Sequence, residues 1–215
     1  MGKEIIKIIK IIIESILDIV YPYENKCIIC DTEGFLGLCS KCKSEIKKID
    51  NQEEILSYGY YGGILKKLIL KLKYHKSFTA GKVLADMLVE FINEKNLDID
   101  FICYVPISKA SLKKRGFNQC KVLATNISYK LNIPIINCLV KVKDTKEQKY
   151  LNKEERVKNI LGAFEVKGKE RLTNKNILLI DDVCTTGATI NECKKNIEKC
   201  NINKIYLLTI AKSNI

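Results

Sequence analysis

Two adjacent carboxylates and several small hydroxyl residues stand close together in the stretch from Asn176 to Cys200. Asp181 and Asp182 are followed by the segment 185–189, in which three threonines surround Gly187. Ionised carboxylates only accept hydrogen bonds, so the pair suits sugar hydroxyls or a hydrated cation. The threonines add hydroxyl donors, and the glycine lets the backbone approach a ligand closely. This chemistry favours a ligand that carries sugar hydroxyls and a phosphate.

The elements on either side would place these residues at the edge of a sheet. Residues 177–180 form an apolar run that is long enough for a buried strand and too short for a helix. Residues 190–200 continue as an amphipathic helix. Ligands usually bind at the carboxyl ends of strands in open α/β sheets. A helix N-terminus there offers unpaired N–H groups and a positive dipole end to a phosphate.

This stretch resembles the phosphoribosyl-pyrophosphate (PRPP) motif of the type I phosphoribosyltransferases. The match covers nine positions: Asp181, Asp182, Val183, Cys184, Thr185, Thr186, Gly187, Ala188 and Thr189. The resemblance implies that the two aspartates hold the ribose 2′ and 3′ hydroxyls and that the loop 185–189 cradles the 5′-phosphate. It also implies Mg²⁺ bound with PRPP. The alternative is an ordinary strand-to-helix turn with a capping threonine.

Four cysteines form two pairs with equal internal spacing. They follow the pattern C-x2-C-x8-C-x2-C and are Cys27, Cys30, Cys39 and Cys42. Each pair can grip one metal ion from a tight turn, and four thiolates suit tetrahedral zinc in a closed structural site. The alternative is four unrelated buried cysteines.

A basic segment follows the strand pattern at residues 101–107. Ser108 and Lys109 stand at the expected strand end, where they could hold a pyrophosphate. Farther on, a cluster of cations with an aromatic neighbour could meet phosphates and stack a base; its members are Lys113, Lys114, Arg115 and Phe117. The alternative for this cluster is a solvated basic loop.

The charge of the chain is strongly positive and unevenly distributed. The 215 residues carry a net charge of +12, and residues 101–150 hold ten Lys/Arg against two Asp/Glu. A one-sided basic surface favours polyphosphate or nucleic acid as a partner. A general bias toward solvated lysines is the alternative source of part of this excess.

The ten cysteines would suit a secreted, disulfide-bonded protein only if the N-terminus carried a signal peptide. Charged residues interrupt the isoleucine-rich stretch 5–20, and no small-residue cleavage site follows it, so we expect neither a signal peptide nor a spanning helix. The cytoplasm is therefore the expected location. The stretch has the pattern of an amphipathic helix that packs on the protein or a partner; attachment to the membrane face is the alternative.

The remaining segments alternate between strand and helix patterns. Strand patterns cover residues 58–61, 101–107, 135–140 and 205–211. Helix patterns cover residues 64–75, 78–95, 113–131 and 154–159, and residues 141–155 read as a polar loop that could form a lid. The alternation predicts an α/β fold with a mainly parallel sheet flanked by helices. We expect two domains, a helix and zinc module at residues 1–50 and a phosphoribosyltransferase-like domain at residues 51–215.

Several short motifs together are similar to the ComF family. They are Lys73-Tyr74, Lys114-Arg115-Gly116-Phe117-Asn118-Gln119, Thr145, Gln148, Leu151, Glu155-Arg156, Asn159 and Gly162-Ala163-Phe164. The family has paired cysteines before a phosphoribosyltransferase-like domain and is associated with DNA uptake and natural transformation. The resemblance implies PRPP, single-stranded DNA and proteins of the DNA-uptake machinery as partners.

Two functions are consistent with these residues. The favoured one is a PRPP-binding, phosphoribosyltransferase-like protein that serves DNA uptake and binds single-stranded DNA. The alternative is an active phosphoribosyltransferase of nucleotide or nucleobase metabolism, in which positioning and electrostatics would supply most of the catalysis. No general base for an acceptor is visible in the sequence, and the sequence does not name the acceptor.

Overall fold

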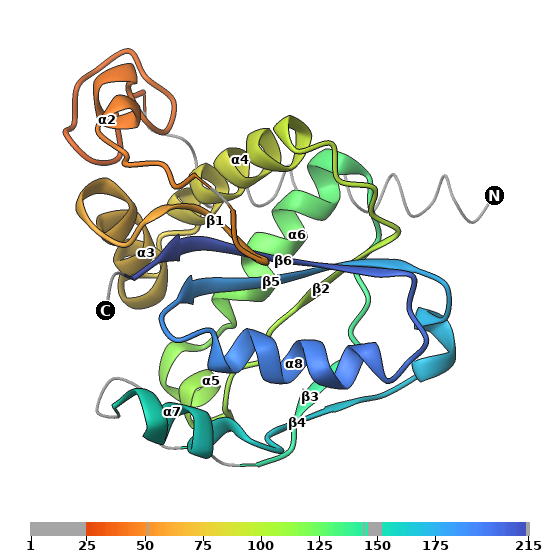
Figure 1. Cartoon of the computed structure of the whole chain (residues 1–215). Coiled ribbons are helices and arrows are strands. Elements are labelled where there is room, and N and C mark those ends of the chain that lie inside the picture. The colour runs from red at the N-terminus through yellow and green to blue at the C-terminus, as the bar shows by residue number, and fades with distance from the viewer. Residues whose placement is uncertain (1–24, 51, 144, 146–151, 214–215) are drawn as a thin grey trace.

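The structure is a computed structural model that describes residues 25–50, 52–143, 145 and 152–213 (Figure 1). The predicted N-terminal helix lies outside these residues, as do Lys146, Gln148 and Leu151. Within the described ranges, no helix combines the length and the apolar character needed to cross a membrane.

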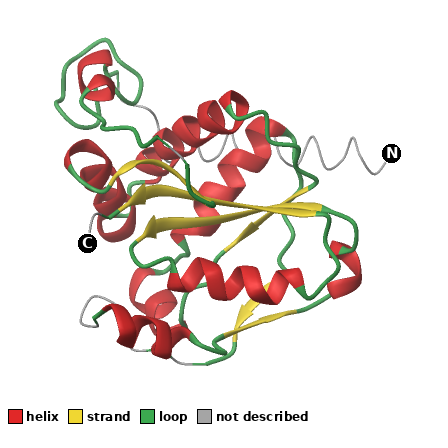
Figure 2. Ribbon diagram, in the orientation of Figure 1, coloured by secondary structure: helices red, strands yellow, loops and turns green. Residues whose placement is uncertain are grey.

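A four-stranded parallel sheet forms the centre of the molecule (Figure 2). Its strands in spatial order are β1 (Ile55–Tyr60), β6 (Lys204–Lys212), β5 (Asn176–Cys184) and β2 (Phe101–Tyr104). In β5, Ile180 pairs with Leu208 of β6 on one side and with Tyr104 of β2 on the other. Parallel strands are covered on both faces, which explains the continuous apolar run at 177–180. The predicted parallel sheet is confirmed.

Helices cover both faces of this sheet. One face packs against α3 (Gly63–His75), α4 (Phe78–Glu94) and α6 (Gln119–Leu131), and the other against α8 (Ala188–Glu198). The strand residues alternate accordingly, because Leu178 and Leu208 face the first layer while Leu179 and Leu207 face the second. Figure 1 shows α8 lying across the sheet on the side opposite α6.

Strand β5 is longer than its apolar run. It continues through Asp181 and Asp182 to Cys184, because β6 runs alongside it and pairs as far as Lys212. The two carboxylates therefore stand on the last part of the strand, where the ladder holds their backbone, whereas the sequence had placed them between the strand and the turn.

The segment 135–140 does not form a strand of the main sheet, contrary to the prediction. Ile136 donates to the Ile102 carbonyl at 2.9 Å, and Ile102 donates to the Pro134 carbonyl at 2.9 Å, so this segment meets β2 at a single position. The chain then diverges into β3 (Leu139–Lys141), which pairs antiparallel with β4 (Phe164–Val166) in a separate two-stranded sheet.

The basic segment forms its own helix, so the single helix predicted over residues 113–131 is wrong. Strand β2 ends at Tyr104, and α5 (Lys109–Arg115) begins after Ser108, whose side chain accepts from the Ser111 N–H at 3.1 Å. Gly116 ends α5 with a φ of 87°, in the left-handed region that favours glycine. Asn118 then caps α6 by accepting from the Cys120 N–H at 2.9 Å.

Three shorter elements complete the described residues. They are α2 (Ser40–Ser44), α7 (Lys153–Ile160) and the 3-10 helix η2 (Lys169–Leu172). A capping box between Asn152 and Glu155 begins α7, so the predicted short helix at 154–159 is confirmed. The segment with α2 lies beside α3 and α4 in Figure 1, and Lys43 forms an ion pair with Glu90 of α4 at 2.8 Å.

Candidate functional site

A cavity of about 210 Å³ opens at the carboxyl ends of β5 and β2. Two segments supply most of its wall, residues 105–108 after β2 and residues 181–190 at the end of β5 and the start of α8. Further side chains come from other elements: Ser111, Arg115, Gln119, Lys141, Thr145 and Phe164. The structure thus brings together the nine motif residues and Ser108, as the topology predicted.

The turn at the floor of this cavity depends on Gly187. Its φ is 73°, and a Cβ there would lie 3.0 Å from Ile55 Cδ1 and 3.1 Å from Asn191 Nδ2. A larger residue would therefore be both strained and crowded. Next to it, the Thr186 hydroxyl oxygen accepts from the Ala188 N–H at 3.3 Å. Because α8 begins at Ala188, the N-terminus of this helix borders the cavity.

Asp182 forms an ion pair with Lys73, which reaches it from the last turn of α3. The side chains of Lys73 and Asp182 are only 18% and 9% exposed, so water screens the pair weakly. Burial raises the pKa of Asp182, but the ammonium group of Lys73 outweighs burial, and the pKa lies below its ordinary value. Burial lowers the pKa of Lys73, and Asp182 more than offsets this. Both groups are therefore charged.

Asp181 has a different environment from its neighbour. Burial, followed by the negative charge of Asp182, raises its pKa from 3.8 to about 7. The Cys120 thiol lies 3.4 Å from one of its carboxylate oxygens. One carboxylate of the pair is thus ionised by its lysine, while the other changes its protonation state near neutral pH.

The residues predicted to bind pyrophosphate and those predicted to bind nucleic acid do not form two separate sites in the structure. Ser108 lines the cavity, whereas Lys109 is exposed and lies outside its wall. Arg115 lines the cavity too, donates to the Gln119 side chain, and has its guanidinium carbon 5.8 Å from the Tyr74 ring centre.

The other predicted nucleic-acid residues point elsewhere. Lys113 and Lys114 are exposed on α5. Phe117 packs against Phe78, with ring centres 5.1 Å apart, and lines a second cavity. The turn at Gly116 separates Phe117 from Arg115, so the proposed cluster of three cations and one ring is divided between two sites.

The four paired cysteines converge as predicted. Their sulfur atoms all lie within 4.8 Å of one another, and the sulfurs of Cys30 and Cys39 are 3.6 Å apart. Tetrahedral zinc with Zn–S bonds of about 2.3 Å would space its sulfurs by roughly 3.8 Å, so this cluster fits such an ion. Hydrogen bonding with Thr32 lowers the pKa of Cys30 to about 6, whereas burial and the neighbouring thiols raise the pKa of Cys42.

Comparison with known proteins identifies the relatives of this chain. Residues 118–215 match the family described as phosphoribosyl transferase domain. Competence protein F of Haemophilus influenzae is 28% identical over 200 residues, which cover 90% of this chain and 86% of that protein. Competence protein ComFC of Streptococcus pneumoniae is 29% identical over 152 residues, which cover 71% of this chain and 65% of that protein. This chain is therefore similar to two competence proteins, and its C-terminal part matches the phosphoribosyl transferase domain.

The parallel sheet flanked by helices agrees with the phosphoribosyl transferase domain that residues 118–215 match, as the motifs implied. Among solved structures, the glutamine PRPP amidotransferase of B. subtilis is 15% identical with a TM-score of 0.43 over 62% of this chain, and the match spans 26% of that chain. The adenine phosphoribosyltransferase of Leishmania tarentolae is 14% identical with a TM-score of 0.41, over 63% of this chain and 71% of that one.

Sequence reasoning missed some residues of the cavity. It assigned Lys73 no role in the site, although Lys73-Tyr74 had matched a ComF motif. That match was the available signal, because a helical pattern does not tell which lysine turns inward. Lys141 and Gln119 also line the cavity, and no feature of the sequence had assigned them to it.

Proposed function

We propose that this chain is a ComF-family protein that binds PRPP in the cavity at the end of β5 and serves DNA uptake by binding single-stranded DNA. The arrangement of Asp181 and Asp182 beside the glycine turn and the N-terminus of α8 carries this proposal. The names of the two competence relatives supply the context of DNA uptake.

Each part of PRPP has a chemical counterpart in the cavity. The two carboxylates accept hydrogen bonds from the ribose hydroxyls, and residues 185–189 donate to the 5′-phosphate from N–H and hydroxyl groups. The guanidinium of Arg115 and the hydroxyl of Ser108 face the same cavity and suit the pyrophosphate. Mg²⁺ would accompany PRPP and offset the charge of its phosphates.

The cysteine cluster is proposed to hold one structural zinc ion through Cys27, Cys30, Cys39 and Cys42. The spacing of the sulfurs supports this assignment, and four protein ligands leave no open position for chemistry. The ion would join the two ends of the loop 27–42, in a segment that contains only the five-residue helix α2.

Replacing both carboxylates should weaken PRPP binding at least tenfold. At pH 8, where Asp181 is also mostly ionised, Asp181→Asn with Asp182→Asn removes two charged acceptors, and each hydrogen bond to a charged group contributes about 1.5–3 kcal/mol. Thr186→Val should weaken binding to a smaller extent, because it removes one hydroxyl donor. Calorimetric titration of PRPP in Mg²⁺ measures the affinities, with Glu165→Gln on β4 as the control. Unchanged affinity in both variants would place the ligand elsewhere, and pyrophosphate release during the titration would indicate transfer.

PRPP affinity should also rise with pH between 6 and 8. Asp181, whose pKa is about 7, is mostly protonated at pH 6 and is then a poorer acceptor for a ribose hydroxyl. We expect roughly tenfold weaker binding at pH 6 than at pH 8. In Asp181→Asn, the part of the pH dependence that comes from Asp181 should disappear. Any part that comes from the titration of PRPP itself should remain. An identical pH profile in the two proteins would contradict the assignment.

The same shift in pKa predicts a pH dependence of stability. Between the ordinary pKa of 3.8 and about 7, folded Asp181 holds a proton that the unfolded chain has released. The contribution of this group to the free energy of unfolding therefore falls as the pH rises through that window.

Binding of single-stranded DNA should depend strongly on salt. Residues 101–143 contain eight Lys/Arg and no Asp/Glu. Lys109, Lys113 and Lys114 are exposed on α5. If each neutralises one phosphate, replacing all three by alanine should reduce the slope of log K against log salt by about 2, at ~0.7 per phosphate.

The matched control for this slope replaces three lysines at the opposite end of the sheet, Lys169, Lys195 and Lys199. Fluorescence anisotropy of a labelled oligothymidine over a range of salt concentrations measures both slopes. A wild-type slope near zero, or equal slopes in the two triple variants, would contradict the proposal that lysines of α5 contact DNA.

A further inference from the structure

A second cavity, of about 570 Å³, lies on the outer side of β2 and behind α5. Its wall comes from the start of α4, from β2, from the junction of α5 and α6, and from the first turns of α6. Pro106 and Ile107 line both this cavity and the one at the end of β5. The two cavities therefore lie back to back across the segment after β2. We refer to the second one as the β2 groove.

Aromatic and aliphatic side chains form one part of the β2 groove. Phe117 and Phe78 contact each other at an interplanar angle of 48°, and Tyr104 lines the groove with them. Leu112 of α5 also lines it and is 47% exposed, which is high for a leucine. A tilted aromatic pair beside an open apolar surface offers a stacking platform for a flat ring.

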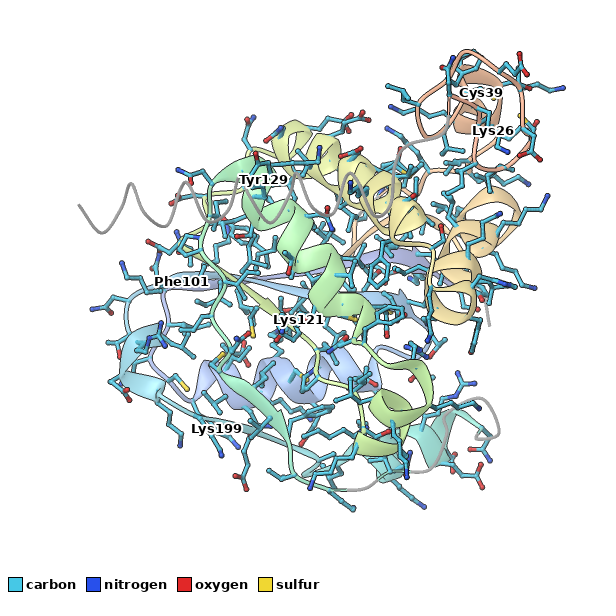
Figure 3. The ribbon with its side chains drawn as sticks, turned by 180° about the vertical axis from the view of Figure 1, so that it is seen from behind. Lys26, Cys39, Phe101, Lys121, Tyr129 and Lys199 are labelled. Carbon is cyan, nitrogen blue, oxygen red and sulfur yellow. The ribbon has the colours of Figure 1, made fainter. Side chains whose placement is uncertain are left out.

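The charge around this platform is positive. Lys82 of α4 and Lys121 of α6 line the groove, and its lining residues include no Asp or Glu. One turn beyond Lys82, the carboxylate of Asp86 forms an ion pair with Lys130 at 2.8 Å. Lys121 is exposed on the face of α6 that is turned toward the viewer in Figure 3. The cations lie on different helices, and Lys113 of α5 follows Leu112, so they suit several phosphates along a strand better than one phosphate.

We propose that the β2 groove holds a base of single-stranded DNA, stacked on Phe117 and Phe78, with neighbouring phosphates at Lys82 and Lys121. This inference rests on the proposed binding of single-stranded DNA and assigns that binding to a specific site. Only an unpaired base exposes the flat face that the rings require. Because the groove is separate from the cavity at the end of β5, DNA and PRPP bind at the same time and do not compete.

The first test substitutes the ring and one lysine in the full chain. Phe117→Leu keeps an apolar side chain but removes the ring, and should weaken binding of oligothymidine roughly 5- to 150-fold. Phe117→Tyr keeps a ring and should restore most of the affinity. Lys121→Glu should weaken binding and lower the salt slope by at least ~0.7. Lys199→Glu, which makes the same charge change just after α8 on the other face of the sheet, should have little effect.

The second test adds saturating PRPP to the protein–oligothymidine complex. PRPP should not displace the oligonucleotide, and Phe117→Leu should bind PRPP as the wild type does. Displacement of DNA by PRPP, or equal DNA affinity in Phe117→Leu and the wild type, would overturn the assignment of the DNA base to the β2 groove. Either result would leave the proposed function in place.

Two further outcomes separate this inference from the proposed function. If the wild type binds PRPP but no oligothymidine, the proposed DNA binding fails and the groove fails with it. If thymidine monophosphate binds as tightly as the oligonucleotide and depends equally on Phe117, the occupant is a free nucleotide, which overturns the assignment to a DNA strand.

Discussion

Replacing Cys39 and Cys42 with serine should unfold the segment 25–46 while β5 and β6 keep their pairing. This segment is small, and its core residues are few: Cys27, Cys39, Cys42 and Ile46. So small a core does not support a fold without a metal or cross-link. Structural zinc contributes about 10–16 kcal/mol in zinc-finger peptides, so its loss should have the largest effect of any change described above.

Metal analysis and hydrogen exchange measure this result. Freshly reduced wild-type protein should carry one zinc per chain, and the double variant none. Amides of residues 25–46 should lose protection in the variant, while those of β5 and β6 remain protected. Cys138→Ser with Cys200→Ser, two buried cysteines outside the cluster, is the matched control and should retain zinc. Wild-type protein without any bound metal would contradict the assignment.

Replacing Lys73 with methionine should destabilise the protein by about 3–5 kcal/mol. The change leaves Asp182 as a buried carboxylate without its partner, and removing one member of a buried pair costs this much. Without the ammonium group, burial alone should raise the pKa of Asp182. The variant should therefore lose stability as the pH rises above the unfolded pKa, whereas the wild-type pair loses its contribution as the pH falls through the folded pKa.

Urea denaturation at several pH values tests this prediction. Lys67→Met, an exposed lysine on the same helix, is the control and should change stability little. Adding Asp182→Asn to Lys73→Met should recover much of the stability, because no unpaired charge remains. The double variant should nevertheless bind PRPP weakly, because it lacks the carboxylate of Asp182. A Lys73→Met protein as stable as the Lys67→Met protein would show that the pair contributes little.

The residues 176–200 show how much of the site the sequence alone determined. An apolar run, a glycine that lets the backbone approach a ligand and an amphipathic repeat are local features, and each depends on neighbours within a few residues. They led to the correct order of strand, turn and helix. The spacing of the four cysteines was equally local, and the alternation of segments was enough to predict the parallel sheet.

The tertiary structure decided which distant residues meet. Lys73 and Asp182 contact each other because α3 packs on the face of the sheet beside the end of β5. The helical periodicity of α3 does not predict where this helix packs. The length of β5 also depends on tertiary structure. Its polar end remains in the strand because it pairs with β6, and not because its own residues are apolar.

Arg115 and Phe117 give the clearest separation of the two contributions. They are two residues apart and were assigned to one DNA-binding cluster, but Gly116 turns the chain between them in the left-handed conformation. Arg115 then faces the cavity at the end of β5, and Phe117 faces the β2 groove. Residue type predicted what each side chain could bind. The direction of each side chain followed from how α5 and α6 pack against β2, which depends on contacts far apart in the sequence.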